Sequence, residues 1–172
     1  MSRVLRAAIA VALAATCVAC EAEQRAPLPP ALAAELATVV VDAFETDRAA
    51  ATALLPPYHG PLVCVAEPFG VDPVTATAAA DVTTIYTALL CSVREEGVPF
   101  AEALGVSSTV AVHRTNPVTV EVPGDGAANQ PDRERIFPED LHERTFEGFR
   151  DPPAAQRELA TRFAEQSQSQ SR

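Results

Sequence analysis

The sequence contains no lysine, no tryptophan and a single methionine, and only 5% of its residues are aromatic. Its thirteen basic residues are therefore all arginine, and 23 aspartates and glutamates outnumber them, which leaves a formal net charge of −10. A strongly acidic chain is repelled by the phosphates of nucleic acids and by the headgroups of anionic lipids. We therefore expect no nucleic-acid partner.

Motifs that indicate a specific chemistry are also missing. The sequence has no HExxH zinc motif, no phosphate-binding glycine loop and no dinucleotide-binding fingerprint. The segment closest to a GxSxG nucleophile elbow, Gly105–Thr109, lacks the second glycine and leads into an expected strand. The sequence therefore predicts no catalytic centre and no cofactor.

One group of polar side chains offers the oxygen ligands that Ca²⁺ binds, but its spacing matches no EF-hand loop. Its members are Asp125, Asn129, Asp132 and Glu134. In so acidic a chain, clusters of this kind arise by chance. We therefore expect no metal site.

The most informative segment is the N-terminus, Arg3–Cys20. Arg3 and Arg6 supply positive charge, Ala7–Ala15 is apolar, and small residues and cysteines follow. This order is typical of a secretory signal peptide. The apolar run is shorter than the ~20 residues that a membrane-spanning helix needs, which argues against a transmembrane anchor.

The end of this segment, Cys17-Val18-Ala19-Cys20, resembles the lipobox of bacterial lipoproteins, in which a small residue precedes a cysteine that is acylated and becomes the new N-terminus. The resemblance implies removal of residues 1–19, a lipid such as palmitate on Cys20, and attachment to the extracytoplasmic side of the cell membrane. Cys17 stands where a leucine is most common, so secretion without a lipid is the alternative. Residues 20–30 are polar and proline-bearing, which is typical of a tether.

Two cysteines remain outside the signal, Cys64 and Cys91. An even pair in an exported domain is typical of a disulfide. The separation of 91 − 64 = 27 positions is unlike a CxxC motif, which favours the disulfide over a redox or metal-binding dithiol.

Hydrophobic periodicity divides the rest of the chain into helices, strands and helices. Apolar residues recur every three or four positions from Leu32 to Phe44, which predicts an amphipathic helix, and a second, shorter helix is expected over Arg48–Leu55. The predicted strands are Leu62–Ala66, Val82–Val93, Thr109–Arg114 and Val118–Val122, and later helices are expected to begin at Asn129, Phe137 and Asp151.

Several details of these elements are also predicted. Val82–Val93 carries apolar residues on both faces, so it is expected to lie inside the sheet, under helices. Glu67–Gly70 is expected to end the first strand, and Thr46 to cap the second helix. Phe146 is expected to point inward, and the Gln/Ser-rich residues 166–172 to be disordered.

These elements predict a single α+β domain over residues 31–165, with a helical pair, an approximately four-stranded and mainly antiparallel sheet, and C-terminal helices. The order loosely resembles NTF2-like and cystatin-like folds. The segment Leu62–Phe146, with its paired cysteines, PFG and PGDG turns and RIFPED helix start, also resembles uncharacterised exported lipoproteins of high-GC Gram-positive bacteria. Neither resemblance implies a known activity.

Three polar side chains are candidates for lining a pocket: His113, Glu67 and Tyr86. His113 points to the face opposite Val112, so it lines a pocket if a curved sheet encloses it and is an ordinary surface residue otherwise. We therefore consider two functions. The first is a non-enzymatic module that binds an envelope protein or a small molecule, and the second is a small hydrolase or isomerase of the NTF2-like kind that uses His113 with a carboxylate.

Overall fold

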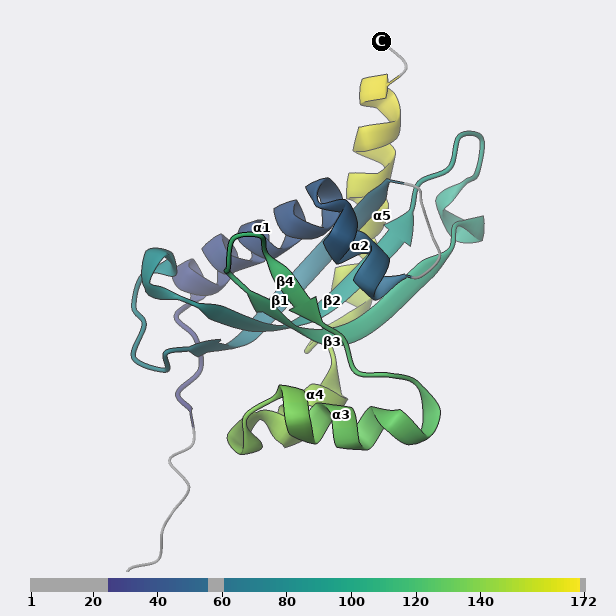
Figure 1. Ribbon diagram of the computed structural model, residues 1–172. Coiled ribbons are helices and arrows are strands. Elements are labelled where there is room, and N and C mark those ends of the chain that lie inside the picture. The colour runs from purple at the N-terminus through teal and green to yellow at the C-terminus, as the bar shows by residue number, and fades with distance from the viewer. Residues whose placement is uncertain (1–24, 56–60, 171–172) are drawn as a thin grey trace, which may run out of the picture.

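The computed structural model describes residues 25–55 and 61–170, so the predicted signal peptide and Cys20 lie outside the described residues. In that part of the chain, helices flank one antiparallel sheet of strand order β1-β2-β3-β4 (Figure 1). The predicted α+β layout is confirmed. The helices are α1 (Pro30–Thr46), α2 (Arg48–Leu54), α3 (Asn129–Ile136), α4 (His142–Glu147) and α5 (Pro152–Gln170), and the strands are β1 (Leu62–Asp72), β2 (Thr84–Val93), β3 (Gly105–His113) and β4 (Thr119–Glu121).

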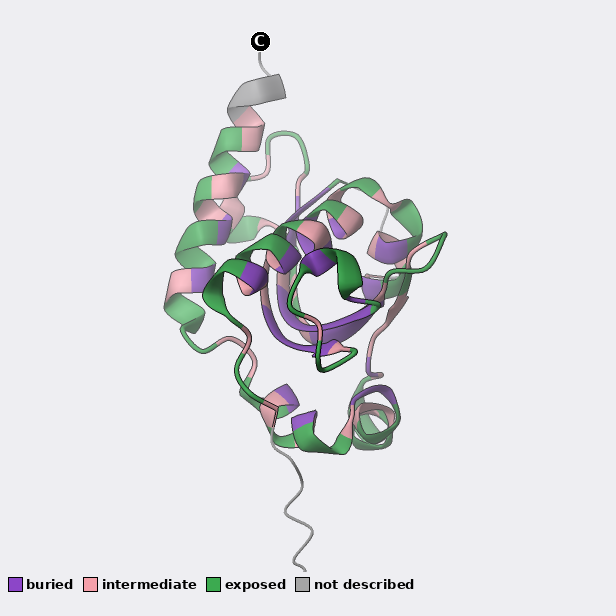
Figure 2. Ribbon diagram, turned by 90° about the vertical axis from the view of Figure 1, so that its left-hand side faces the viewer, coloured by how far each residue is buried: buried purple, intermediate pink, exposed green. Residues whose placement is uncertain are grey.

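Helices α1 and α2 cover one face of the sheet, and the strands curl around the side that they occupy (Figure 2). Leu36, Val40 and Phe44 lie on one stripe of α1 and are almost completely buried, as the periodicity predicts. They pack in one core with Ile85 and Leu89 of β2. Burial of this apolar stripe holds the helix on the sheet.

The opposite face of the sheet carries two separate apolar clusters. Leu159 and Phe163 of α5 pack on Val63 and Val65 of β1. The segment containing α3 and α4 covers the other end, where Phe137 packs near the ring of Tyr86. Because β2 contributes to the cores on both faces, the prediction that this strand lies inside the sheet under helices is confirmed.

Cys64 and Cys91 lie directly opposite each other on β1 and β2 and form a disulfide, with their Cα atoms 4.1 Å apart. Both residues are fully buried in the core under α1. The predicted pairing is confirmed. The bond joins the edge strand β1 to its inner neighbour β2, near the start of β1.

Two strands are longer than predicted. Glu67–Gly70 does not end the first strand, because β1 continues to Asp72 through a shift of register between Pro68 and Gly70. The extra residue, Phe69, turns its ring toward Phe137, with 6.3 Å between ring centroids. A proline is tolerated here because β1 is an edge strand. Strand β3 likewise begins at Gly105, earlier than predicted.

Two predicted details of the helices are wrong. Asp47, rather than Thr46, caps α2, since its carboxylate accepts the backbone N–H of Ala49 at 2.7 Å, whereas Thr46 is the last residue of α1. Phe146 does not point inward: it is 63% exposed, and its ring lies 4.7 Å from the guanidinium carbon of Arg133. The inward position on this turn belongs to its neighbour, the buried Thr145.

Both ends of the predicted domain also differ from the prediction. Helix α5 continues to Gln170, so residues 166–170 are helical, and Gln166 donates a hydrogen bond to Glu45 of α1 at 3.2 Å. At the other end, Leu28 packs against the main core and Arg25 is bound to the domain. The described part of the predicted tether therefore lies on the domain surface. None of the helices in the described residues has the length and apolar character needed to cross a bilayer.

Candidate functional site

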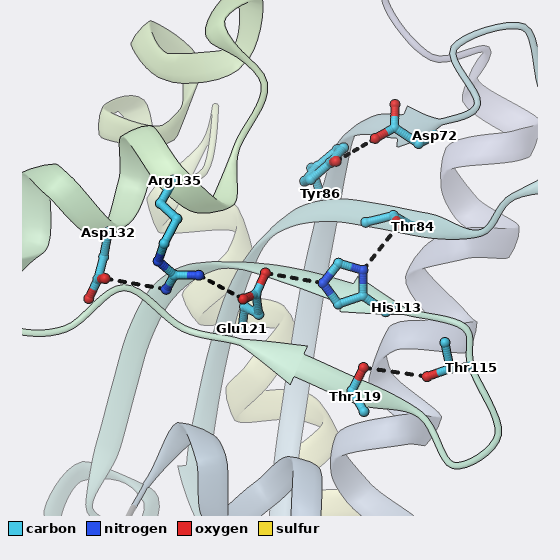
Figure 3. A network of polar contacts seen from close by, with 9 residues as sticks. All are labelled: Asp72, Thr84, Tyr86, His113, Thr115, Thr119, Glu121, Asp132 and Arg135. Carbon is cyan, nitrogen blue, oxygen red and sulfur yellow. Dashed lines mark hydrogen bonds and ion pairs between the residues drawn. The ribbon is translucent and has the colours of Figure 1, made fainter.

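A row of polar side chains crosses one end of the sheet (Figure 3). Asp72, Thr84, His113 and Thr119 occupy directly paired positions on β1 to β4. Directly paired residues of neighbouring strands point to the same face. Tyr86, two positions along β2 from Thr84, packs with α3 and the following turn, so the row lies on the face that the C-terminal helices cover.

His113 lies at the centre of this row and has a polar partner at each ring nitrogen. Its Nδ1 is 3.2 Å from the hydroxyl of Thr84, and its Nε2 is 3.3 Å from a carboxylate oxygen of Glu121. A carboxylate only accepts hydrogen bonds, so Nε2 of His113 is the donor to Glu121, whereas the Thr84 hydroxyl can either donate to Nδ1 or accept from it. The His113 side chain is 30% exposed.

Glu121 connects His113 to helix α3. Arg135 donates to the other carboxylate oxygen of Glu121 at 2.8 Å and also reaches Asp132 at 3.3 Å. The hydrogen bond from Arg135 lowers the pKa of Glu121, and the contact with His113 lowers it further. Asp132 accepts the backbone N–H of Gly124 at 2.9 Å, and this bond is the main reason that the pKa of Asp132 is also lowered.

Tyr86 lies beside this network, but its contacts are with Asp72 and Phe137. Its hydroxyl donates to Asp72 at 2.5 Å, and its ring packs 5.8 Å from the ring of Phe137. Burial raises the pKa of Tyr86 well above its ordinary value, and the hydrogen bond to Asp72 adds to that shift. Tyr86 therefore remains protonated at physiological pH and acts as a hydrogen-bond donor.

Arg25 lies at the β1 end of the row. Its guanidinium contacts Asp140 at 2.8 Å, Asp72 at 3.1 Å and the backbone carbonyl of Val71, and it lies 5.7 Å from the centre of the Tyr86 ring. The side chain is only 14% exposed. We call this set of contacts the Arg25 clamp. It fixes the chain that precedes α1 to the end of β1.

Glu67 lies on the same face as Tyr86 but takes part in a different set of contacts. Its carboxylate pairs with Arg144 at 2.7 Å and accepts the backbone N–H of Arg150 at 3.0 Å. Arg144 in turn lies over the ring of Phe69, 4.9 Å from its centre. These contacts attach the segment around α4 to β1, which indicates a structural role for Glu67.

Two pockets on the described surface lie elsewhere, and neither contains His113, Glu67 or Tyr86. One, of about 620 Å³, lies at the opposite end of the sheet, and the other, of about 550 Å³, lies beside the start of α5. The larger is lined by Pro61, Arg94, Glu95, Glu96, Gly97, Val98, Pro99 and Ser167, and the smaller by Phe100, Pro152, Pro153, Gln156, Arg157 and Ala160.

Two of the carboxylates that the sequence groups as possible Ca²⁺ ligands, Asp132 and Glu134, lie in α3 and have partners within the protein. Asp132 binds Arg135, and Glu134 accepts from Gln130 at 2.9 Å. Across residues 25–55 and 61–170, no three His, Cys, Asp or Glu side chains come together as a possible metal site.

Comparison with known proteins adds no assignment to this geometry. No family model, curated protein or solved structure matches the chain.

The chemistry of the polar row indicates what it can do. Thr84, His113 and Glu121 follow one another in the order hydroxyl, imidazole and carboxylate, which is the order of a general-base relay. The Thr84 residue is 9% exposed, which leaves its hydroxyl little access to a substrate.

Proposed function

We propose that this protein is an exported lipoprotein, anchored to the extracytoplasmic side of the cell membrane through a lipid on Cys20, and that its acidic α+β domain is a non-enzymatic binding or envelope-associated module. One observation carries the proposal: the order of positive, apolar and small residues over Arg3–Cys20, which ends in a cysteine. The buried disulfide between Cys64 and Cys91 supports it, since disulfides persist in oxidising compartments outside the cytoplasm.

The polar row supports the non-enzymatic part of the proposal. Both ring nitrogens of His113 are occupied by neighbouring side chains, and neither pocket described above reaches it. Glu67 and Tyr86 serve packing and ion pairing. Glu67 and Tyr86 connect the sheet to the C-terminal segment through Arg144 and Phe137, and His113 connects Thr84 of β2 to Glu121 of β4.

Metabolic labelling with a radioactive fatty acid tests the anchor. In a high-GC Gram-positive host, the wild-type protein is expected to incorporate label and to remain with the membrane fraction, whereas Cys20→Ala is expected to lose both properties. Cys17→Ala is the matched control, since it removes the neighbouring cysteine of the same motif, and it should keep both. Loss of label in Cys17→Ala with retention in Cys20→Ala would move the lipid to the other cysteine, and an unlabelled wild type would refute the anchor.

Chemical cross-linking in intact membranes tests the binding module. A specific partner should be recovered with the wild type and lost, or much reduced, with Cys20→Ala, which cannot stay at the membrane. Recovery of no partner by the anchored protein, together with turnover of a substrate by the purified domain, would reject the non-enzymatic assignment.

The second candidate function is a small hydrolase, and the contacts of Thr84, His113 and Glu121 favour it. In this mechanism the threonine hydroxyl attacks an acyl carbonyl while its proton passes to Nδ1 of His113, and Glu121 stabilises the imidazolium. The imidazolium then returns the proton to the leaving group as the acyl bond to it breaks, and water activated by His113 hydrolyses the acyl-threonine. Hydrolysis of p-nitrophenyl acetate is a direct assay. A rate that exceeds the buffer rate, is lost in His113→Ala and is retained in His142→Ala would establish this function, and a rate that His113→Ala leaves unchanged would exclude it.

A further inference from the structure

The Arg25 clamp shortens the chain that connects the domain to Cys20. A residue spans at most about 3.6 Å, so the five residues from Cys20 to Arg25 reach at most about 18 Å. Without the clamp, the next residue packed on the domain is Leu28, and the eight residues from Cys20 to Leu28 would reach about 29 Å. The clamp therefore shortens by more than a third the distance over which the domain can move away from an anchor at Cys20.

The clamp lies at one end of the sheet. Strand β1 has 11 residues, and at about 3.3 Å per residue its two ends are at most about 33 Å apart. Asp72, at the last position, belongs to the clamp. The other end of β1 adjoins the larger pocket, where the backbone N–H of Arg94 donates to the carbonyl of Pro61 at 2.9 Å.

The charge of the domain does not favour contact of the far end with the membrane. Removal of Arg3 and Arg6 with the signal leaves 11 arginines against 23 acidic residues, a net charge of 11 − 23 = −12. Glu95 and Glu96 line the pocket at the far end. Asp72 and Asp140 place carboxylates at the clamp end as well, so repulsion by anionic lipid headgroups acts on both ends. The short covalent connection therefore decides which end stays near the bilayer.

We infer that Arg25 sets the orientation of the domain on the membrane. The end with Asp72 and Asp140 faces the bilayer, and the end with the pocket around Arg94 faces away from it, toward partners in the envelope. This inference rests on the proposed lipid anchor at Cys20.

Resonance energy transfer from a donor dye on the protein to acceptor dyes in the bilayer, measured with the donor at each of two positions, tests the orientation. Val74→Cys places a donor dye in the exposed loop after β1, near the clamp, and Glu96→Cys places it near the far pocket. The native cysteines at 64 and 91 are in the disulfide and do not take the label. The lipidated full-length protein is reconstituted into liposomes that carry an acceptor dye on their headgroups. Transfer should be roughly twofold higher from position 74 than from position 96, because the two ends of β1 are up to about 33 Å apart.

Two changes should remove this difference by different means. Arg25→Ala releases the clamp, and insertion of a ten-residue Gly/Ser linker between residues 24 and 25 lengthens the arm while leaving the clamp contacts intact. Both should bring the ratio of the two transfers toward one. Arg48→Ala, which removes an exposed arginine of α2, is the matched control and should keep the wild-type ratio. The linker variant keeps the test valid if Arg25→Ala fails to fold.

The outcomes separate the orientation from the anchor. Protein that does not float with liposomes contradicts the lipid anchor and, with it, the orientation. Protein that floats but shows equal transfer from both positions contradicts the orientation alone. A wild-type preference that persists in both Arg25→Ala and the linker variant would show that something other than the clamp orients the domain, and would overturn the role given to Arg25.

Discussion

Removing the disulfide between Cys64 and Cys91 should lower the unfolding free energy of the domain by about 3 to 4 kcal/mol. The bond closes a loop with a sequence separation of 27. The chain-entropy relation for a loop of that length gives about 12 cal/mol/K, which is about 3.5 kcal/mol at 25 °C. The perturbation is the double substitution of both cysteines by alanine, which avoids placing an unpaired thiol or hydroxyl in a fully buried site.

Urea unfolding followed by circular dichroism at 25 °C measures this loss. The double variant combines loss of the cross-link with loss of two buried sulfur atoms, so wild-type protein that has been unfolded, reduced and refolded in the presence of a reductant is the matched control. It keeps the sulfur atoms and lacks only the bond. Both proteins should be destabilised, and the double variant somewhat more. A change of less than about 1 kcal/mol in both would refute the loop-entropy reasoning.

Three further perturbations test the packing and the polar contacts. Glu45→Ala should cost about 2 to 3 kcal/mol by urea unfolding, because it leaves the N–H of Cys64 and the guanidinium of Arg162 without their acceptor, whereas Glu35→Ala, on the exposed side of the same helix, should change stability by less than about 0.5 kcal/mol. Phe44→Ala should cost about 3 to 5 kcal/mol in the same assay, since the ring is almost fully buried; a loss below 1 kcal/mol would contradict the packing. Glu121→Gln should cost less than about 1 kcal/mol at pH 7, because the carboxylate is 39% exposed. The folded-state pKa of Glu121 lies below its ordinary value of 4.5, so this contribution is present above pH 4.5 and is lost as the pH falls through the folded-state pKa. Unfolding at pH 7 and at about pH 3 should therefore show the two proteins converging in acid, and a gap that widens in acid would contradict the pairing.

The elements that the sequence predicts best are those with a regular spacing of apolar residues. The stripe from Leu32 to Phe44 and the two apolar faces of Val82–Val93 predict a helix and an inner strand, and the structure contains both. The period of the apolar residues indicates which face of an element is buried, so these elements can be predicted without the rest of the chain. The disulfide was predictable from the cysteine count, because only two cysteines remain outside the predicted signal peptide.

Elements that depend on distant partners were not predictable in this way. Pro68 and Gly70 are typical of a turn, yet β1 runs through them because Phe69 finds a partner in Phe137, which lies far along the chain. Helix α5 extends into a Gln/Ser-rich segment, where Gln166 hydrogen-bonds to Glu45 of α1. Local composition carries no information about such contacts.

The polar site shows the same limit. The alternation of the hairpin places Glu121 opposite the valines of its strand, so its face was readable, but its pairing with His113 required the register of β3 and β4. The sequence around Arg25 did not predict its contacts with the domain. Arg25 stands in a polar, proline-bearing segment typical of a tether, and its partners Asp72 and Asp140 are distant in sequence.

The central claim is that Cys20 is the lipid-bearing N-terminus of the mature protein, and mass spectrometry of protein extracted from membranes tests it most directly. The N-terminal peptide is expected to begin at Cys20 and to carry the added mass of a diacylglyceryl group, in the wild type and in Cys17→Ala alike. A mature chain that begins at another residue, or one that begins at Cys20 without lipid mass, would contradict the account and would also remove the basis for the orientation set by Arg25.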